Sequence, residues 1–197
     1  MSTPVSAATT ATTDTTPRRR RADAERNRIR VLDAARTLFA ERGDDVSMEE
    51  VARQAGVGIG TLYRHFPTKE AMVEAAAQQR FGDILTYYRE VCRERPEPLD
   101  ALSLLLTHIG ETQVRDRGFC SVVEATVGSG EAPGELRAEF EGELVDLINK
   151  GQADGTIRED VEGADILAVT CGLATVVSRA SGDWHRFVEI VVSGLRR

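Results

Sequence analysis

The sequence predicts an all-α fold in which a small N-terminal unit of three helices precedes a larger helical domain. Apolar residues recur three and four positions apart along most of the chain, and glycines and prolines fall between these periodic segments. No segment shows the apolar–polar alternation of a β-strand. Together these observations favour helices joined by short loops.

The first helix is expected from about Asn27 to Arg42, where Gly43 follows as a stop. A second helix begins after Ser47, a good N-cap residue, with Glu50 placed as its capping-box partner. Gly56 tolerates the positive φ that ends such a helix, and a third helix then runs to Phe66. Further helices are expected at residues 69–95 (as one helix or a kinked pair), 99–112, 115–127, 136–153, 166–178 and 184–195.

The segment before the first helix differs in composition from the rest of the chain. Residues 1–17 are almost all Ser, Thr, Ala and Pro, and Arg18 to Arg21 follow directly. We therefore expect residues 1–21 to form a disordered, arginine-rich arm. The arginines are either a solvated charge run or an arm that touches phosphates or a minor groove.

The 197 residues carry a net charge of −7, which is unevenly distributed. Residues 1–70 hold 12 Lys and Arg against 10 Asp and Glu, a balance of +2, whereas residues 71–197 hold 13 against 22, a balance of −9. Binding to phosphate needs a local basic surface, so the overall acidity does not exclude a nucleic-acid partner.

The second and third helices have the lengths of a helix-turn-helix, here residues 47–66. At about 100° per residue, Ile59, Leu62 and Phe66 cluster as the expected buried face of the third helix.

Gly60, Thr61 and Arg64 lie opposite that buried face. Such residues suit a helix in a major groove, because glycine permits close approach, threonine contacts a thymine methyl or a phosphate, and arginine reaches a guanine edge.

Tyr63 and His65 lie on the flanks, where they can donate to phosphates, and Lys69 adds a charge at the next helix start. The alternative is that these are the polar residues that any three-helix unit exposes.

Three segments carry a resemblance to a known family. They are TLFAERG at 37–43, SMEEVARQAGV at 47–57 and GTLYRHF at 60–66, followed by Lys69 and Glu70. They closely resemble the DNA-binding domain of the tetracycline-repressor (TetR) family over roughly residues 27–75. One departure is Gly58-Ile59, where many members carry Ser-Lys or Ser-Arg, and the arginine-rich arm is a candidate to compensate.

The resemblance implies a division into a helix-turn-helix DNA-binding domain at 22–68 and a helical regulatory and dimerisation domain at 69–197. It implies a homodimeric repressor that binds an inverted-repeat DNA operator and is released by a small-molecule effector. The implied DNA-binding residues are Ser47, Gly60, Thr61, Tyr63, Arg64, His65 and Lys69.

The helix expected at 166–178 is apolar nearly all round, so it must be covered on most sides. It predicts either a core helix within one subunit or, with the helix at 184–195, a four-helix dimer interface. The resemblance favours the dimer. The candidate interface residues are Ala168, Gly172, Trp184, Phe187 and Val191.

Candidates for a ligand pocket are aromatic and polar residues of the middle helices, and the alternative for each is plain core or surface. They are Phe81, Tyr87, His108, Phe119 and Cys120. Few charges fall on the apolar faces there, which favours an apolar or mildly polar ligand.

The sequence does not predict catalysis or a cofactor. The three cysteines have no metal-ligand or disulfide spacing, so we expect no metal. An enzyme with Cys120 as nucleophile and His108 or His185 as base is an alternative, but no catalytic signature surrounds these residues. A helical ligand sensor without DNA binding is the other alternative. The N-terminal segment lacks the apolar core of a signal peptide, and the longest apolar run has 12 residues against the roughly 20 of a membrane span, so we expect a cytoplasmic protein.

Overall fold

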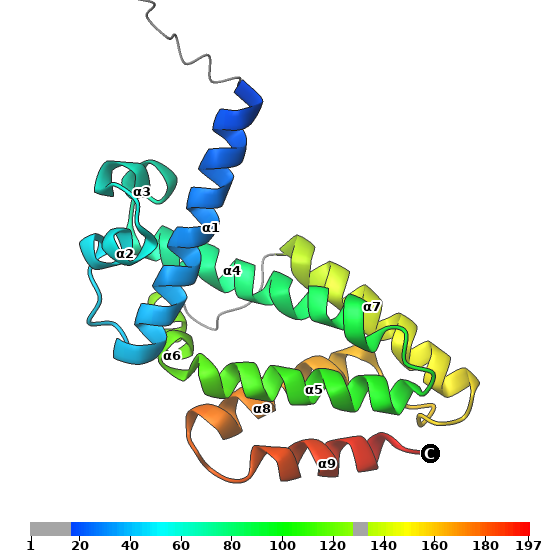
Figure 1. Ribbon diagram of the computed structural model, residues 1–197. Coiled ribbons are helices and arrows are strands. Elements are labelled where there is room, and N and C mark those ends of the chain that lie inside the picture. Colours follow the sequence, from blue (N-terminus) through cyan, green and yellow to red (C-terminus); the bar gives the residue numbers. More distant parts are fainter. Residues whose placement is uncertain (1–16, 128–133) are drawn as a thin grey trace, which may run out of the picture.

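The computed structural model describes residues 17–127 and 134–197, and these residues form helices and no strand (Figure 1). The N-terminal unit comprises α1 (Pro17–Arg42), α2 (Met48–Ala55) and α3 (Ile59–His65). The predicted all-α fold is confirmed.

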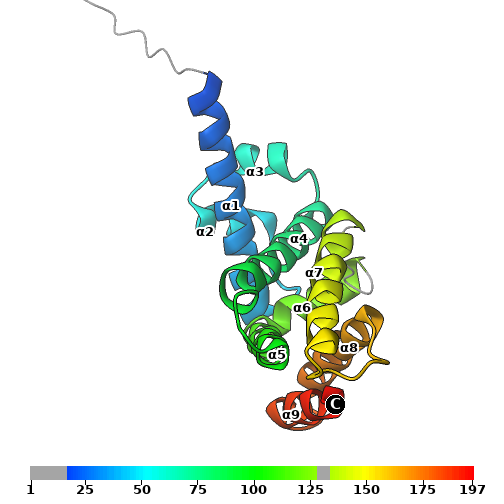
Figure 2. The same cartoon turned by 90° about the vertical axis from the view of Figure 1, so that its right-hand side faces the viewer.

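The larger domain begins with α4 (Lys69–Tyr87), which leads away from the N-terminal unit and ends in a π-helical turn, Tyr88–Cys92. The domain continues through α5 (Pro98–Arg115), α6 (Arg117–Val127), α7 (Gly134–Ala153), α8 (Gly163–Ser178) and α9 (Trp184–Leu195). Figure 2 shows α9 at the end of the molecule opposite the N-terminal unit. None of the helices within the described ranges is long and apolar enough to cross a membrane.

The first helix begins at Pro17, so the prediction of a disordered arm is wrong for residues 17–21. Arginine and alanine are good helix formers, and ion pairs one turn apart, Asp23 with Arg26 and Glu25 with Arg28, support the extension. Residues 21–30 include no buried residue, so packing does not hold this part in place. Residues 1–16 of the predicted arm lie outside the described residues, as do residues 128–133, which fall between the helices expected at 115–127 and 136–153.

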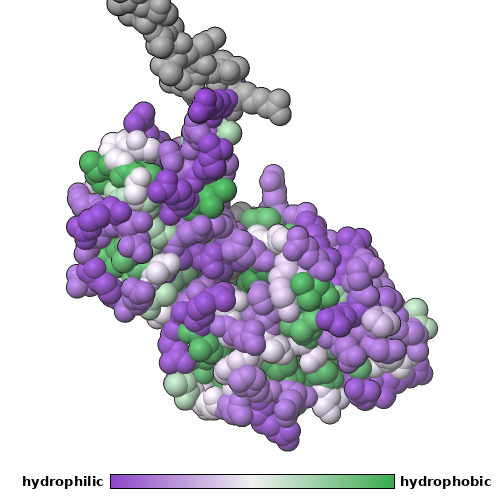
Figure 3. Space-filling view, viewed as in Figure 1, coloured by the Kyte–Doolittle hydropathy of each residue, from purple (hydrophilic) through white to green (hydrophobic). Residues whose placement is uncertain are grey.

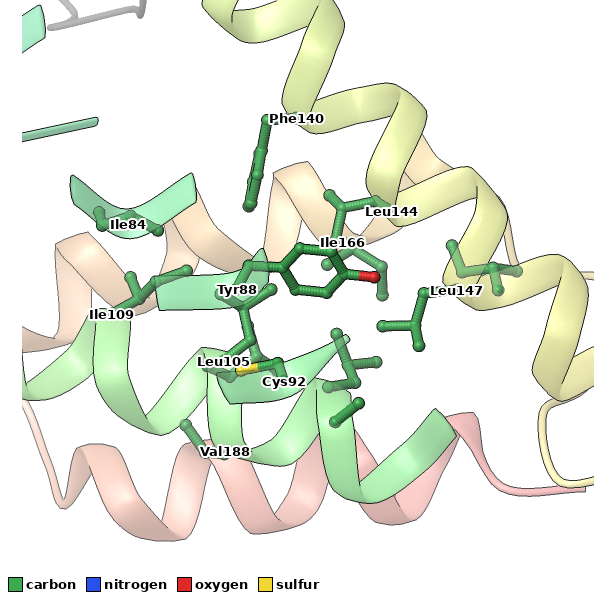
Figure 4. Close-up of a cluster of buried hydrophobic side chains, with 14 of the residues drawn as sticks. Ile84, Tyr88, Cys92, Leu105, Ile109, Phe140, Leu144, Leu147, Ile166 and Val188 are labelled. Atoms are coloured by element: carbon green, nitrogen blue, oxygen red, sulfur yellow. The ribbon is translucent and has the colours of Figure 1, made fainter. Parts of the chain in front are cut away.

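The core of the larger domain lies among α4, α5, α7, α8 and α9. Figure 4 shows Ile84, Tyr88, Leu105, Leu144 and Ile166 from this core converging on one another. These apolar side chains fill the space between the helices.

A second core joins the N-terminal unit to α4 and α6. Phe119 of α6 is 1% exposed and stacks on Phe39 of α1, with 6.4 Å between ring centroids. The expectation that Phe119 belongs to a ligand pocket is therefore wrong. Gly118 makes this approach possible, because a Cβ there would stand 2.5 Å from the carbonyl oxygen of Ala40.

Candidate nucleic-acid interface

The sequence-predicted caps hold α2 in place. The Ser47 hydroxyl accepts a hydrogen bond from the Glu50 amide at 3.2 Å, and the Glu50 carboxylate accepts one from the Ser47 amide at 2.9 Å. Arg42 donates to the same carboxylate at 2.7 Å, and with the Ser47 amide it lowers the pKa of Glu50 to about 2. Gly56 closes the helix at φ 65°, so the predicted capping box and glycine stop are confirmed.

The buried face of α3 is smaller than predicted. Leu62 is fully buried and Phe66 is 3% exposed, whereas Ile59 is 39% exposed. Ile59 is the first residue of a seven-residue helix, one turn before Leu62, and the core does not reach it. The prediction that Ile59 is buried is wrong, and its side chain instead adds apolar surface beside Tyr63, which is 44% exposed.

The opposite face of α3 is open and polar. A Cβ on Gly60 would have no heavy atom within 4 Å, so nothing in the described part of the chain covers this position. Arg64 lies back along the helix, where its Nε donates to the Gly60 carbonyl at 3.0 Å and its Nη2 to the Thr61 hydroxyl at 3.1 Å. The structure thus brings the exposed Gly60 and Arg64 together with the half-buried Thr61 on one surface.

His65 and Lys69 are less available than the sequence suggested. His65 is half-buried, with its ring 6.2 Å from that of Phe66. The Lys69 ammonium donates to the Asp44 carbonyl at 2.7 Å, pairs with the Asp44 carboxylate at 2.8 Å and lies 5.3 Å from the centre of the Phe39 ring. Any contact of Lys69 with phosphate must therefore compete with Asp44.

Two arginines of α1 lie beside the motif, and the sequence reasoning missed them. The Arg28 guanidinium stands 5.7 Å from the centre of the Phe66 ring. A Cβ on Gly56 would meet Arg30 Nη2 at 2.6 Å. Figure 3 shows the upper part of α1 as a hydrophilic projection from the N-terminal unit. The repeated arginines in residues 18–30 could have indicated these positions from the sequence. The fold was needed to show that Arg28 and Arg30 face Phe66 and the turn at Gly56.

The five pocket candidates do not form one cavity. Phe81 packs edge-on against Phe140 at 5.4 Å, while Tyr87 and His108 stack on each other at 3.6 Å. Cys120 lies 3.1 Å from Gln113 Oε1, and burial raises the pKa of its thiol, which disfavours a nucleophilic thiolate. Tyr87 and His108 line a cavity of about 300 Å³ that does not include Phe81, Phe119 or Cys120, and its other walls carry several charged groups. A larger cavity of about 570 Å³ between α7 and α8 contains none of the candidates.

The five dimer candidates divide between surface and core. Ala168 is exposed, and Gly172 lies against Phe187, since a Cβ there would stand 3.3 Å from the Phe187 ring. Val191 is half-buried against the core of its own subunit. The Trp184 ring covers Gly110 of α5, where a Cβ would stand 2.4 Å away, so Trp184 belongs to the intrachain packing.

Comparisons with known proteins agree with this architecture. Residues 31–76 match the model described as "Bacterial regulatory proteins, tetR family", and residues 97–197 match "Transcriptional regulator SbtR-like, C-terminal domain". A TetR transcription regulatory protein from Mycobacterium vanbaalenii is 37% identical with a TM-score of 0.67, and the match covers 90% of this chain and 99% of that one. For a TetR regulator from Streptomyces coelicolor the values are 34%, 0.65, 86% and 98%.

Among curated proteins, an HTH-type transcriptional regulator from Staphylococcus aureus (strain USA300) is 27% identical over 106 residues. That match covers 53% of this chain and 57% of the relative, so the chain spans little more than half the length of the curated relatives that it matches. The two family models and the two solved structures each agree with the helix-turn-helix followed by a helical domain. The chain therefore belongs to the TetR family of bacterial regulatory proteins.

Proposed function

We propose that this chain is a dimeric, sequence-specific transcriptional repressor that binds an inverted-repeat operator and is released by a small ligand. The observation that carries the proposal is the open polar face of α3, formed by Gly60, Thr61 and Arg64 on a helix fixed by α2. Binding to chromosomal DNA would place the protein in the cytoplasm.

In this proposal α3 lies in the major groove. Gly60 allows the backbone to approach the bases, and Thr61 contacts a thymine methyl or a phosphate. Arg64 exchanges its hydrogen bonds with Gly60 and Thr61 for a guanine edge. Ile59, being exposed, adds a second apolar contact for a thymine methyl.

Phosphate contacts fix the register of the helix in the groove. We assign them to the side chains that border α3: Ser47, Tyr63, His65 and Lys69. The arginines of α1 extend this basic border, since Arg28 and Arg30 lie against the end of α3 and the turn after α2.

The dimer is proposed to form through α8 and α9. The exposed side of α8 carries small residues at helical spacing, Ala164, Ala168, Cys171 and Thr175, which permit another helix to approach closely. Ile190 of α9 is 57% exposed, although it is large and apolar. Pairing these surfaces would bury both and place two copies of α3 on one duplex, as an inverted repeat requires.

A small ligand is supported by structures that share this fold at low identity. FadR from Bacillus subtilis was solved in complex with stearoyl-CoA, and RolR in complex with resorcinol. Release follows when the ligand favours a conformation in which the two α3 helices no longer match the operator.

The test is selection of bound sequences from a random duplex pool. We expect an inverted repeat, with affinity that falls steeply as salt rises. Enrichment without any symmetric motif would refute the proposal. No enrichment at all would favour the alternative, a ligand sensor without DNA binding, for which the support is that Gly58 caps α3 with no side-chain hydrogen bond.

A further inference from the structure

A cavity of about 300 Å³ lies where the N-terminal unit meets the larger domain. Residues from α1, α4, the π-helical turn and α5 line it, among them Arg36, Arg80, Tyr87, His108, Thr112 and Arg115. This volume is at the lower end of the range for small-molecule sites.

The wall of this cavity holds more positive than negative charge. Asp116, 6% exposed, accepts hydrogen bonds from Arg36 at 3.2 Å and Arg80 at 3.3 Å, and lies 3.3 Å from Arg115. Asp83 pairs with Arg36 at 2.7 Å. Among the groups shielded from solvent, Arg36 and Arg80 face the single carboxylate of Asp116, two positive charges against one negative, whereas Asp83 and Arg115 are exposed. Glu90 also lines the cavity, but it is exposed, so solvent screens its charge.

One of these guanidinium groups has an unused donor. Arg80 Nη2 is buried and has no hydrogen-bond partner among the described residues. A buried donor without an acceptor is costly, so this position favours an acceptor. A water molecule would accept the hydrogen bond, whereas a carboxylate would also neutralise the excess positive charge.

Another part of the wall is formed by two aromatic rings. The Tyr87 and His108 rings stack in parallel, 3.6 Å apart and 8° from coplanar. Burial lowers the pKa of His108, which keeps its imidazole neutral near pH 7. A planar apolar group would pack against these rings.

We propose that this cavity is the effector site and that it takes a small monocarboxylate with a flat apolar body. The site lies beside ion pairs that connect the two domains. Arg36 belongs to α1, Arg80 to α4 and Asp116 to the turn between α5 and α6. A carboxylate that takes Arg80 from Asp116 weakens the ionic contact that joins these elements. The consequence for the operator rests on the function proposed above, and the coupling is reciprocal.

Calorimetric titration with benzoate and with benzamide, its uncharged analogue of similar size, tests the site. We expect one benzoate per chain, bound at least about tenfold more tightly than benzamide, because the charged acceptor makes the stronger hydrogen bond. Arg80→Gln should abolish this preference, and Arg26→Gln, on an exposed part of α1, should retain it. Equal affinity for the two probes, or no benzoate binding at millimolar concentrations, would overturn the proposal.

A second measurement uses the unaltered protein, in case Arg80→Gln does not fold. The chain has three histidines, so the His108 ring can be followed by NMR. Burial and Arg115 lower the pKa of His108 and Glu111 raises it, with burial the largest effect, and a bound carboxylate should shift this pKa upward. The His65 and His185 rings do not line the cavity, so they serve as internal controls whose NMR signals benzoate should leave unchanged. A His108 titration unchanged by benzoate would reject the site.

Operator binding is measured separately. Benzoate should weaken it in the native protein and leave it unchanged in Arg80→Gln. If benzoate binds but operator affinity stays the same, the effector role is wrong. If benzoate binds and no DNA sequence does, the proposed function fails and the ligand site stands.

Discussion

Side chains of the helix-turn-helix have structural tasks beside the proposed recognition. Glu50 completes the cap of α2 and also receives Arg42 from the end of α1, which ties the two helices together. Arg64 makes two hydrogen bonds within α3, to Gly60 and Thr61, which keep it on the open face until it exchanges them for a base.

Glu50 should make stability depend on pH. Its carboxylate has a pKa of about 2 in the folded protein, against an ordinary value of 4.5. Its contribution to the free energy of unfolding is therefore present in full above pH 4.5 and is lost as the pH falls toward 2. Glu50→Gln should flatten the dependence of the unfolding free energy on pH over this interval, as measured by urea denaturation. Glu49→Gln, on an exposed position of the same turn, is the control. Identical profiles for Glu50→Gln and the native protein would contradict this assignment.

Arg64 and Tyr63 should differ in what they contribute to operator binding. Arg64→Ala should cost about 1–3 kcal/mol at the base pair that it reads and should relax preference there. Tyr63→Phe removes a phosphate donor and should weaken binding to all sequences alike. Affinities for a set of single-base operator variants measure both effects. The same pattern for both replacements would show that the groove assignment is wrong.

At the scale of elements, the two halves of α1 differ in how deeply they are buried. The C-terminal half carries Val31, Leu32 and Phe39 into the core that includes α6. The N-terminal half buries no residue between Arg21 and Arg30 and carries a high density of arginine. The core packing that fixes α1 in the molecule therefore comes from its C-terminal half.

Replacing Arg18 to Arg21 by glutamine should weaken binding to operator and to random DNA together. Each phosphate that the arginines no longer neutralise should reduce the slope of log affinity against log salt by about 0.9. Replacing Arg18 and Arg19 alone by glutamine is compared with Arg93→Gln plus Arg95→Gln, at exposed positions after the π-helical turn, because both changes remove two positive charges. A salt slope that is equal in all these proteins would leave the arginines as a solvated charge run.

At the scale of the whole molecule, the two hydrophobic cores determine which helices are packed together as a unit. Phe119, Val122 and Val123 place α6 in the same core as α1 and α2, while the C-terminal end of α4 and most of α5 belong to the other core. Asp116 and the arginines that pair with it, Arg36 and Arg80, lie at the boundary between the two cores. A displacement of α6 must therefore displace the N-terminal unit.

Dimer formation should depend on the small residues of α8. Ala168→Glu places a charge on the proposed interface and should give a monomer in analytical ultracentrifugation, with operator affinity reduced at least about a hundredfold because each half-site is then bound alone. Ala138→Glu, on an exposed position of α7, should remain dimeric. A dimeric Ala168→Glu would place the interface elsewhere.

Local signals in the chain were enough to define the helices and the recognition motif. Caps, glycine stops and three-four periodicity are such signals, so the ends of α2 and α3 and the open face with Gly60, Thr61 and Arg64 were predictable. The packing of distant helices was needed to learn that Phe119 faces α1, that Ile59 is exposed, that Trp184 covers Gly110 and that three arginines meet at Asp116. These facts depend on which helices lie side by side. A periodic pattern predicts that one face of a helix is buried, but it does not predict which other helix covers that face.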